Sequence, residues 1–178
     1  MKKVVGLMLF AAVIFAFSGI TSAQIEEGNK ELQALFSFQT TSGEGSVDTL
    51  IIMGGLGYYF TQNHAAGINL MLMTYTEPIE DEWMGLAPIQ VFYTYNFIVQ
   101  NPKLVPYVGA SVGKVALIGD MMPDISIWIY GANGGIKYFI SENTALVPQV
   151  LLQRTTMSNG DSVSETTFTL MAGISTFF

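Results

Sequence analysis

Hydrophobic residues alternate with polar or small residues along most of the chain. In 50–61, one parity carries no charge and holds Leu50, Ile52, Leu56, Tyr58 and Phe60. Similar alternation recurs in 66–73, 89–97, 128–140, 146–153 and 167–178. Because successive side chains of a β-strand point to opposite faces, a period of two predicts strands with one apolar face.

Turn-forming residues separate these runs at seven places, which are 41–45, 62–63, 77–82, 100–102, 119–124, 141–143 and 158–161. Seven turns join eight strands, each of roughly 11 to 16 residues, which is enough to cross the apolar layer of a membrane at a tilt near 45°. An even number lets the first and last strands pair in antiparallel fashion and close the sheet. Pro106 and Pro148 fall at the starts of strands, where proline is tolerated, whereas Pro88 predicts a bulge or a break in the ladder.

One parity of the strands is almost free of charge, which decides between a soluble and a membrane barrel. Only 12% of the 178 residues are charged and 50% are hydrophobic, whereas about a quarter of an ordinary soluble chain is charged. A soluble lipocalin-like barrel or a β-sandwich would need a wetted outer face. The exceptions on this parity, Lys114 and Arg154, lie near the far ends of their strands, where long side chains reach lipid headgroups. The predicted fold class is therefore all-β, an eight-stranded antiparallel up-and-down transmembrane β-barrel.

Residues 1–23 have the three parts of a secretory signal peptide. A basic head, Met1-Lys2-Lys3, precedes an apolar run over 4–17 and the small residues Thr21-Ser22-Ala23. The run of about 14 residues is shorter than the roughly 20 that a transmembrane helix needs. We therefore expect cleavage after Ala23 and a barrel domain over 24–178. Removal of Lys2 and Lys3 leaves five of the seven basic residues against 14 acidic ones, which argues against a nucleic-acid-binding surface.

An even number of strands places both termini at one end of the barrel. The connections at that end, near 62, 101 and 142, are the shorter ones, and short turns of bacterial outer-membrane barrels face the periplasm. Outward-facing aromatic residues gather near both ends, as expected for the two interfaces of a membrane. The periplasmic group comprises Tyr58, Phe60, Tyr95, Phe97, Tyr138 and Phe178, and the outer group comprises Trp83, Trp128 and Tyr130.

The chain contains four recognisable segments, which are GLGYYFTQN over 55–63, PYVGASVG over 106–113, GGIKYFISEN over 134–143 and FTLMAGISTFF over 168–178. They resemble segments of the small bacterial outer-membrane β-barrel family, the OmpA-, OmpX- and OmpW-like barrels. The last one resembles the C-terminal assembly signal of these proteins, with Phe168, Leu170, Ile174 and Phe178 at the matching positions. The resemblance implies export to the bacterial outer membrane and insertion by the barrel-assembly machinery. The expected partners are outer-membrane lipids and lipopolysaccharide, and the barrel is expected to be a monomer.

The inward parity predicts a lumen whose two halves differ. Toward the periplasmic side it offers Gln33, Asn69, Thr94, Asn96, Ser111, Asn133, Lys137, Gln149 and Ser175. Toward the outer side it offers Ile51, Met53, Met71, Met73, Tyr75, Ile127, Ile129, Leu151 and Met171. Lys137 is an inward cation, so we expect it to have a polar or acidic partner across the lumen.

The lumen pattern leaves two functions open. The first is a structural or surface-interactive role with a lumen filled by side chains, because an eight-stranded barrel is just wide enough to hold them. The alternative is a carrier or narrow channel for small apolar molecules. Its candidate ligand site comprises Met53, Met71, Met73, Tyr75, Ile129 and Met171.

Residues that serve in enzymes and metal sites are scarce in this chain. It has no Cys and one His, His64, which is predicted to lie in a periplasmic turn with no Ser and acid arranged beside it. The run Glu80-Asp81-Glu82 in an outer loop offers oxygen ligands for a divalent cation, but adjacent carboxylates alone are a weak signal. No glycine-rich phosphate loop or zinc motif is present. We therefore expect no enzymatic activity, no metal site and no cofactor.

Cleavage of the signal peptide is directly testable. The mature chain recovered from membranes should begin at Gln24, because Ala23 ends the small-residue motif. N-terminal sequencing or intact-mass measurement checks the position. Ala23→Lys should block processing, whereas the matched small substitution Ala23→Ser should not. A mature chain that still carries Met1 would contradict the prediction.

Overall fold

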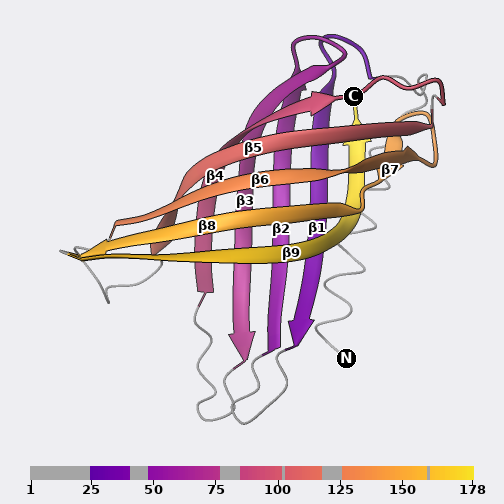
Figure 1. Ribbon diagram of the computed structural model, residues 1–178. Coiled ribbons are helices and arrows are strands. Elements are labelled where there is room, and N and C mark those ends of the chain that lie inside the picture. Colours follow the sequence, from indigo (N-terminus) through magenta and orange to yellow (C-terminus); the bar gives the residue numbers. More distant parts are fainter. Residues whose placement is uncertain (1–24, 41–47, 77–84, 102, 118–125, 160) are drawn as a thin grey trace.

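The computed structural model describes residues 25–40, 48–76, 85–101, 103–117, 126–159 and 161–178. Its strands are β1 (Lys30–Thr40), β2 (Asp48–Tyr59), β3 (His64–Thr76), β4 (Gly85–Asn96), β5 (Leu104–Leu117), β6 (Ser126–Phe139), β7 (Thr144–Leu146), β8 (Gln149–Asn159) and β9 (Asp161–Phe177) (Figure 1). No helix in these ranges is long and apolar enough to cross a membrane. The expected signal peptide lies outside the described residues.

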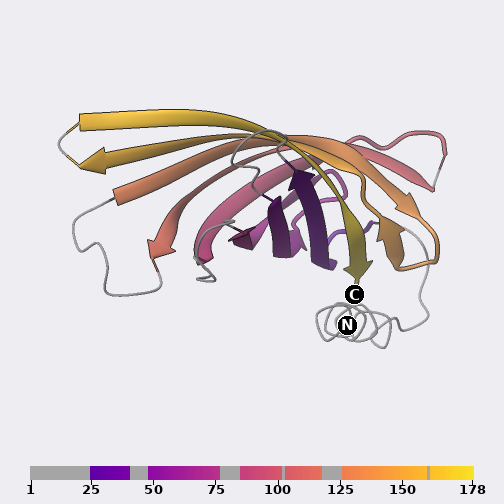
Figure 2. The ribbon, with the colours of Figure 1, turned by 90° about the horizontal axis from the view of Figure 1, so that it is seen from below.

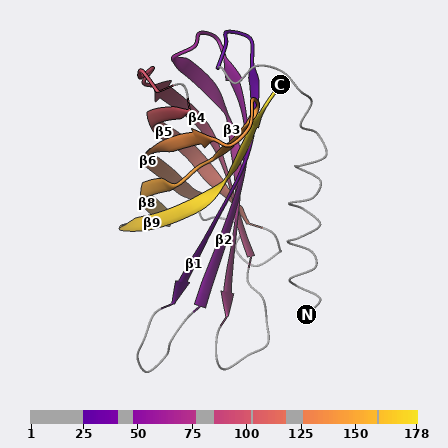
Figure 3. The same ribbon diagram turned by 90° about the vertical axis from the view of Figure 1, so that its right-hand side faces the viewer.

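The strands form one up-and-down antiparallel sheet that closes on itself. β1 to β6 pair in chain order, and β6 then pairs with β7 and β8, which both pair with β9. β9 returns to β1, with pairs from Glu31↔Phe177 to Phe36↔Ala172. Figure 1 shows β1, β2 and β3 crossing β5, β6, β8 and β9 at a steep angle, and Figures 2 and 3 show the strong curvature of the sheet between these groups.

β7 and β8 are two segments of a single strand. Tyr138 pairs with Leu146 and Gly135 pairs with Gln149, so both segments keep the same register with β6. Val147 exchanges two backbone hydrogen bonds with Gly173 across the interruption. The nine segments therefore make eight strands, and the predicted eight-stranded antiparallel barrel is confirmed. Pro148 stands directly before β8, and its missing N–H explains the interruption.

The ladder between β3 and β4 is broken beside Pro88, as the sequence predicts. The pair Leu70↔Ile89 is followed by Met73↔Leu86, with two positions on each strand left unpaired. The register is the same on both sides of the break, so no residue is bulged out. On the other side of its strand, Pro88 is paired in the ladder with β5. The break therefore affects one ladder only.

Alternate side chains face the lumen and the outside as predicted. On β9, Phe168 and Leu170 are 61% and 65% exposed, whereas the neighbouring Met171 is 4% exposed. The outward aromatic residues Tyr58, Phe60, Phe97, Tyr138 and Phe178 are all exposed, and each lies near the end of the barrel where the described chain begins and ends. We call this the terminal end and the opposite one the distal end. A contiguous exposed apolar wall is the surface that a lipid bilayer requires.

The first and last strands meet at the terminal end through Lys30 and Phe178. These two residues exchange backbone hydrogen bonds of 2.8 and 3.0 Å. Farther along the seam the backbones approach closely at Gly173. A Cβ placed on Gly173 would lie 1.9 Å from the carbonyl oxygen of Ala34. Only glycine fits there, because a backbone oxygen in a paired strand cannot move aside.

Gly173→Ala tests the close approach at the seam. The added methyl should lower the free energy of unfolding by about 1–3 kcal/mol, the usual cost of overpacking, or prevent closure. Gly54→Ala is the matched control, because nothing lies within 4 Å of a Cβ at that position. Urea unfolding in lipid vesicles, together with heat-modifiable gel mobility, measures both variants. Equal stability of the two variants would contradict the seam geometry.

Candidate functional site

The lumen contains three layers of inward-facing side chains, and the first is an apolar cluster at the terminal end. It consists of Ile25, Tyr59, Ala65, Phe139, Ala145 and Phe177, with Val105 packed against it. The ring centroid of Phe177 lies 5.2 Å from that of Phe139 and 6.0 Å from that of Tyr59. The inward parity predicted only polar residues in this half of the lumen, and the apolar cluster that covers them was not predicted.

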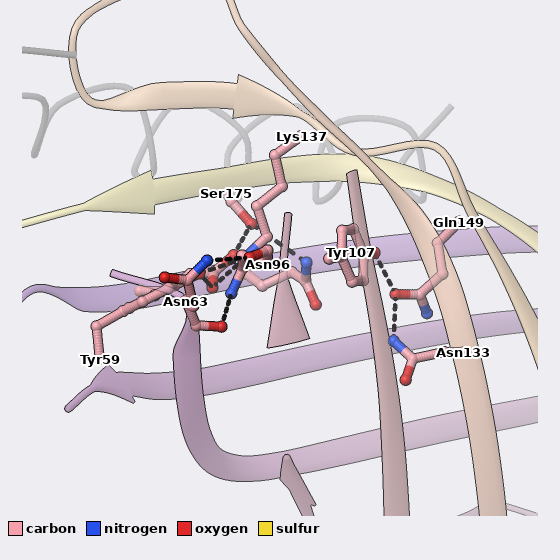
Figure 4. A network of polar contacts seen from close by, with 10 residues as sticks. Tyr59, Asn63, Asn96, Tyr107, Asn133, Lys137, Gln149 and Ser175 are labelled. Carbon is pink, nitrogen blue, oxygen red and sulfur yellow. Dashed lines mark hydrogen bonds and ion pairs between the residues drawn. The ribbon is translucent and has the colours of Figure 1, made fainter. Parts of the chain in front are cut away.

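The second layer is polar and is built around a buried ion pair (Figure 4). The Nζ of Lys137 lies 2.7 Å from Oε2 of Glu31, and the two side chains are 2% and 7% exposed. Tyr59 donates its hydroxyl to the same carboxylate oxygen at 2.8 Å, and Ser175 donates to Oε1 at 2.6 Å. Lys137 also donates to the Tyr59 hydroxyl. Both carboxylate oxygens therefore have partners from other strands, as a buried charge requires.

Aromatic rings surround the Lys137 ammonium group. Its Nζ lies 5.1 Å from the ring centroid of Tyr59, 5.2 Å from that of Tyr107 and 5.4 Å from that of Phe177. Cation–π attraction to these rings adds to the ion pair and offsets part of the loss of hydration. The expected polar or acidic partner across the lumen is thus Glu31, which is 106 positions away in the chain.

A second set of polar contacts extends the layer toward the distal end (Figure 4). The hydroxyl of Tyr107 donates to Oε1 of Gln149 at 2.5 Å, and Nδ2 of Asn133 donates to the same oxygen at 3.0 Å. Around these groups is a narrow cavity with room for roughly one or two water molecules. Its lining includes Asn69 and Gln90, whose Oδ1 and Nε2 atoms have no protein partner in the described part of the chain. Ordered water is the natural partner for these buried atoms.

The third layer is the apolar cluster toward the distal end, where the sequence analysis placed the candidate ligand site. Met53, Met71 and Met171 are buried there together with Leu35, Ile51, Tyr107, Val147 and Leu151, and Met73 packs against them. Ile129 is buried in the lumen but is not part of this cluster. The side chain of Tyr75 lies outside the described residues. The structure thus brings four of the six candidates together in a packed cluster.

His64 lies on the outer surface of the barrel and begins β3. Its Nδ1 is 2.5 Å from the hydroxyl of Tyr93, and its ring contacts those of Phe60 and Tyr95. It therefore belongs to the belt of outward aromatic residues at the terminal end and is only partly exposed. The sequence pattern predicted a periplasmic turn at this position, whereas His64 is the first residue of β3 and shares the outward parity of that strand.

The other candidate residues can be placed only in part. Phe168, Leu170, Ile174 and Phe178, which match the assembly signal, share the outward face at the last strand. The acidic run Glu80-Asp81-Glu82 lies outside the described residues. Within the described ranges, no three His, Cys, Asp or Glu residues are grouped closely enough to hold a metal ion.

Glu31 and Tyr59 are the main lumen residues that the sequence analysis overlooked. Glu31 has the parity of Gln33, and Tyr59 has that of Met53, so both point inward by the same rule that identified the other lumen residues. Neither was recognised as a lumen residue, because an acid and a tyrosine at the end of a strand resemble turn and interface residues. If the alternation of inward and outward side chains is extended to the ends of the strands, it predicts that both residues face the lumen.

A closed eight-stranded antiparallel barrel with an exposed apolar wall and a side-chain-filled lumen is the architecture of small transmembrane β-barrels. Neisserial surface protein A shares it with a TM-score of 0.56 at 16% identity, covering 84% of this chain and 96% of its own. E. coli outer membrane protein W shares it with a TM-score of 0.55 at 16% identity, covering 86% of this chain and 99% of its own. A de novo designed transmembrane β-barrel has a TM-score of 0.55 at 17% identity, and the match covers 87% of this chain and 99% of the designed one. No protein-family model and no curated protein matches the chain.

These likenesses confirm the predicted resemblance to small outer-membrane barrels at the level of the fold. At sequence identities of 16% and 17%, the likeness shows a shared fold but not a shared activity or ligand. One of the three barrels was designed, so the architecture does not by itself imply a biological role. The role of this chain therefore depends on its own lumen and surface.

Substitution of one partner of the buried ion pair tests the polar layer. Glu31→Gln leaves the Lys137 ammonium without its carboxylate and should cost about 3–5 kcal/mol of unfolding free energy. Lys137→Met leaves the Glu31 carboxylate without its cation and should lower the unfolding free energy by a similar amount. The double variant should lose clearly less than the two single losses combined, because neither charge is then left unpaired. Urea unfolding in vesicles supplies the four stabilities.

The exposed Lys103→Gln is the matched control and should change stability little, because surface charges contribute about 0–1 kcal/mol. Additive losses in the double variant would show that Glu31 and Lys137 do not interact energetically. Such a result would contradict the central contact of the polar layer.

Proposed function

We propose that this chain is a small integral protein of the bacterial outer membrane whose lumen is closed and whose role is structural or surface-interactive. The observation that carries the proposal is the filling of the lumen. Apolar clusters occupy both of its ends, and the ion pair of Lys137 and Glu31 crosses the layer between them. A barrel without a passage acts through its lipid-facing wall and its loops.

The proposed location rests on three independent features. Residues 1–23 have the composition of an export signal. The outward face of the described strands carries exposed large hydrophobic side chains from β1 to β9. Phe168, Leu170, Ile174 and Phe178 share one face of the last strand, in the pattern expected of an assembly signal. Export, insertion by the barrel-assembly machinery and residence in the outer membrane together account for all three.

The proposed partners are lipids, and the proposed state is a monomer. The exposed apolar wall extends around all the strands, so lipid is the partner that covers it completely. Lipopolysaccharide is the expected component at the distal end, which faces outward if the short turns are periplasmic. The filled lumen needs no second subunit to complete it.

A carrier for small apolar molecules is the second candidate, and one observation favours it. The broken stretch of the β3–β4 ladder includes Met71, which belongs to the distal apolar cluster. Two residues on each strand there have no ladder partner on the other strand. A weakened ladder beside an apolar cluster is a place where an apolar molecule could pass between lumen and lipid.

Planar-bilayer recording tests whether the lumen is an open pore, which neither of the two candidate functions requires. The wild-type barrel should show no steady conductance, because its cavity holds only roughly one or two water molecules. The double variant Phe139→Ala and Phe177→Ala removes the ring contact at the terminal end and should raise conductance above that of the wild type. Steady wild-type conductance would contradict the closed lumen.

Crystals soaked with a linear alkane provide the complementary measurement. Alkane density among Met53, Met71 and Met171 would favour the carrier over the closed structural barrel. An unchanged methionine cluster would favour the closed barrel.

A further inference from the structure

The outward face of four adjacent strands carries two polar rows near the distal end. β5, β6, β8 and β9 lie side by side there (Figure 1). The ladder pairs place Lys114, Trp128, Thr156 and Ser164 in one row across the strands. The next row toward the terminal end holds Val112, Tyr130, Arg154 and Thr166. We call these two rows the distal patch.

The wall directly below the distal patch is apolar. The next row comprises Ala110, Ala132, Leu152 and Phe168, and the row after it comprises Val108, Gly134, Val150 and Leu170. Phe168 and Leu170 are among the most exposed large hydrophobic residues of the described chain. Such a boundary between an apolar wall and a polar patch is expected near the level of the lipid headgroups.

The two cations of the patch are available for an anion. Neither Lys114 nor Arg154 forms an ion pair with another described residue. The Nζ of Lys114 lies 4.5 Å from the ring centroid of Trp128, so a cation–π contact holds the ammonium group beside that ring. The nearest described acid along β9, Glu165, has the opposite parity and points to the other face of the sheet. The patch is therefore positively charged although the chain as a whole is acidic.

Aromatic and hydroxyl groups lie between the cations. The rings of Trp128 and Tyr130 are stacked, with centroids 6.4 Å apart and an interplanar angle of 15°. They are 39% and 49% exposed, so their faces are accessible from the membrane interface. The hydroxyls of Thr156 and Ser164 lie 3.1 Å apart beside them. Stacked rings and hydroxyls are suited to the face and the edge of a sugar.

We propose that the distal patch is a binding site for a glycolipid that carries two phosphates on its headgroup, with Lys114 and Arg154 each contacting one phosphate. Their Cα atoms are two strands and two residues apart in the register, a separation of about 12 Å. At that separation of the Cα atoms, each cation can contact a phosphate of its own. The acyl chains would lie along the apolar rows below. The inference rests on the proposed membrane location but not on a closed lumen.

Tryptophan fluorescence tests the site, because Trp128 is one of only two tryptophans in the chain. In a Trp83→Phe background, the emission of the barrel in phosphatidylcholine nanodiscs reports on the patch alone. The titrants are a bis-phosphorylated acylated glucosamine disaccharide, its mono-phosphorylated form and phosphatidylglycerol. The bis-phosphorylated lipid should shift the emission at the lowest concentration, and loss of one phosphate should weaken binding about fivefold.

Substitution of the cations should produce the same loss from the protein side. Lys114→Gln and Arg154→Gln should each weaken binding of the bis-phosphorylated lipid about fivefold, and the double variant should lose more. Lys103→Gln, an exposed cation at the terminal end, is the matched control and should bind as the parent does. Native mass spectrometry of the bound lipid gives a second readout that does not depend on Trp128.

Three results would overturn the proposal. Equal binding of phosphatidylglycerol and the bis-phosphorylated lipid would show a general attraction to anionic lipid. An equal loss in Lys103→Gln would have the same meaning. Loss of binding on addition of EDTA, with no effect of Lys114→Gln or Arg154→Gln, would assign the contact to a bridging divalent cation. None of these results depends on the bilayer recordings, so the two proposals can fail separately.

Discussion

Within a bilayer there is no water to satisfy backbone N–H and C=O groups, and this constraint determines the architecture of the chain. A sheet meets it only by closing, so β9 must return to β1 and the strand count must be even for an antiparallel seam. Closure in turn separates the side chains into a lipid face and a lumen face. The ladder is interrupted beside Pro88 and at Pro148, because proline lacks the N–H that a complete ladder needs.

The lumen shows how a narrow barrel accommodates polar side chains without a channel. Glu31 and Lys137 would be unfavourable in an apolar interior if either stood alone. Hydrogen bonds from Tyr59 and Ser175, together with the rings around the ammonium group, satisfy the charges on several sides. The apolar clusters above and below then exclude bulk water. The resulting order of layers, apolar, polar and apolar, favours a static interior over a conduit.

Much of the fold could be predicted from the sequence because a period of two is a direct consequence of strand geometry. Parity identified the lipid face, the methionines of the distal cluster and the inward cation Lys137. It did not identify the partner of that cation, because partnership across a barrel depends on register and strand tilt, which alternation alone does not encode. The terminal cluster of Phe139 and Phe177 was missed for a related reason. Adjacent aromatic residues at a strand end, such as Phe177 and Phe178, point to opposite faces, and composition alone does not distinguish them.

The seam between β1 and β9 also bears on how the barrel persists once it has formed. Glu31 of β1 contacts Ser175 of β9, 144 positions away, and Lys137 of β6, 106 positions away, so these contacts form only when the sheet closes. Contacts between such distant residues form slowly, because the chain must close a long loop first. Until closure, both charges remain hydrated, and the closing step must remove that water. Reopening requires breaking the ion pair and the seam together, so the barrel is expected to owe its lifetime to a high unfolding barrier as much as to its equilibrium stability.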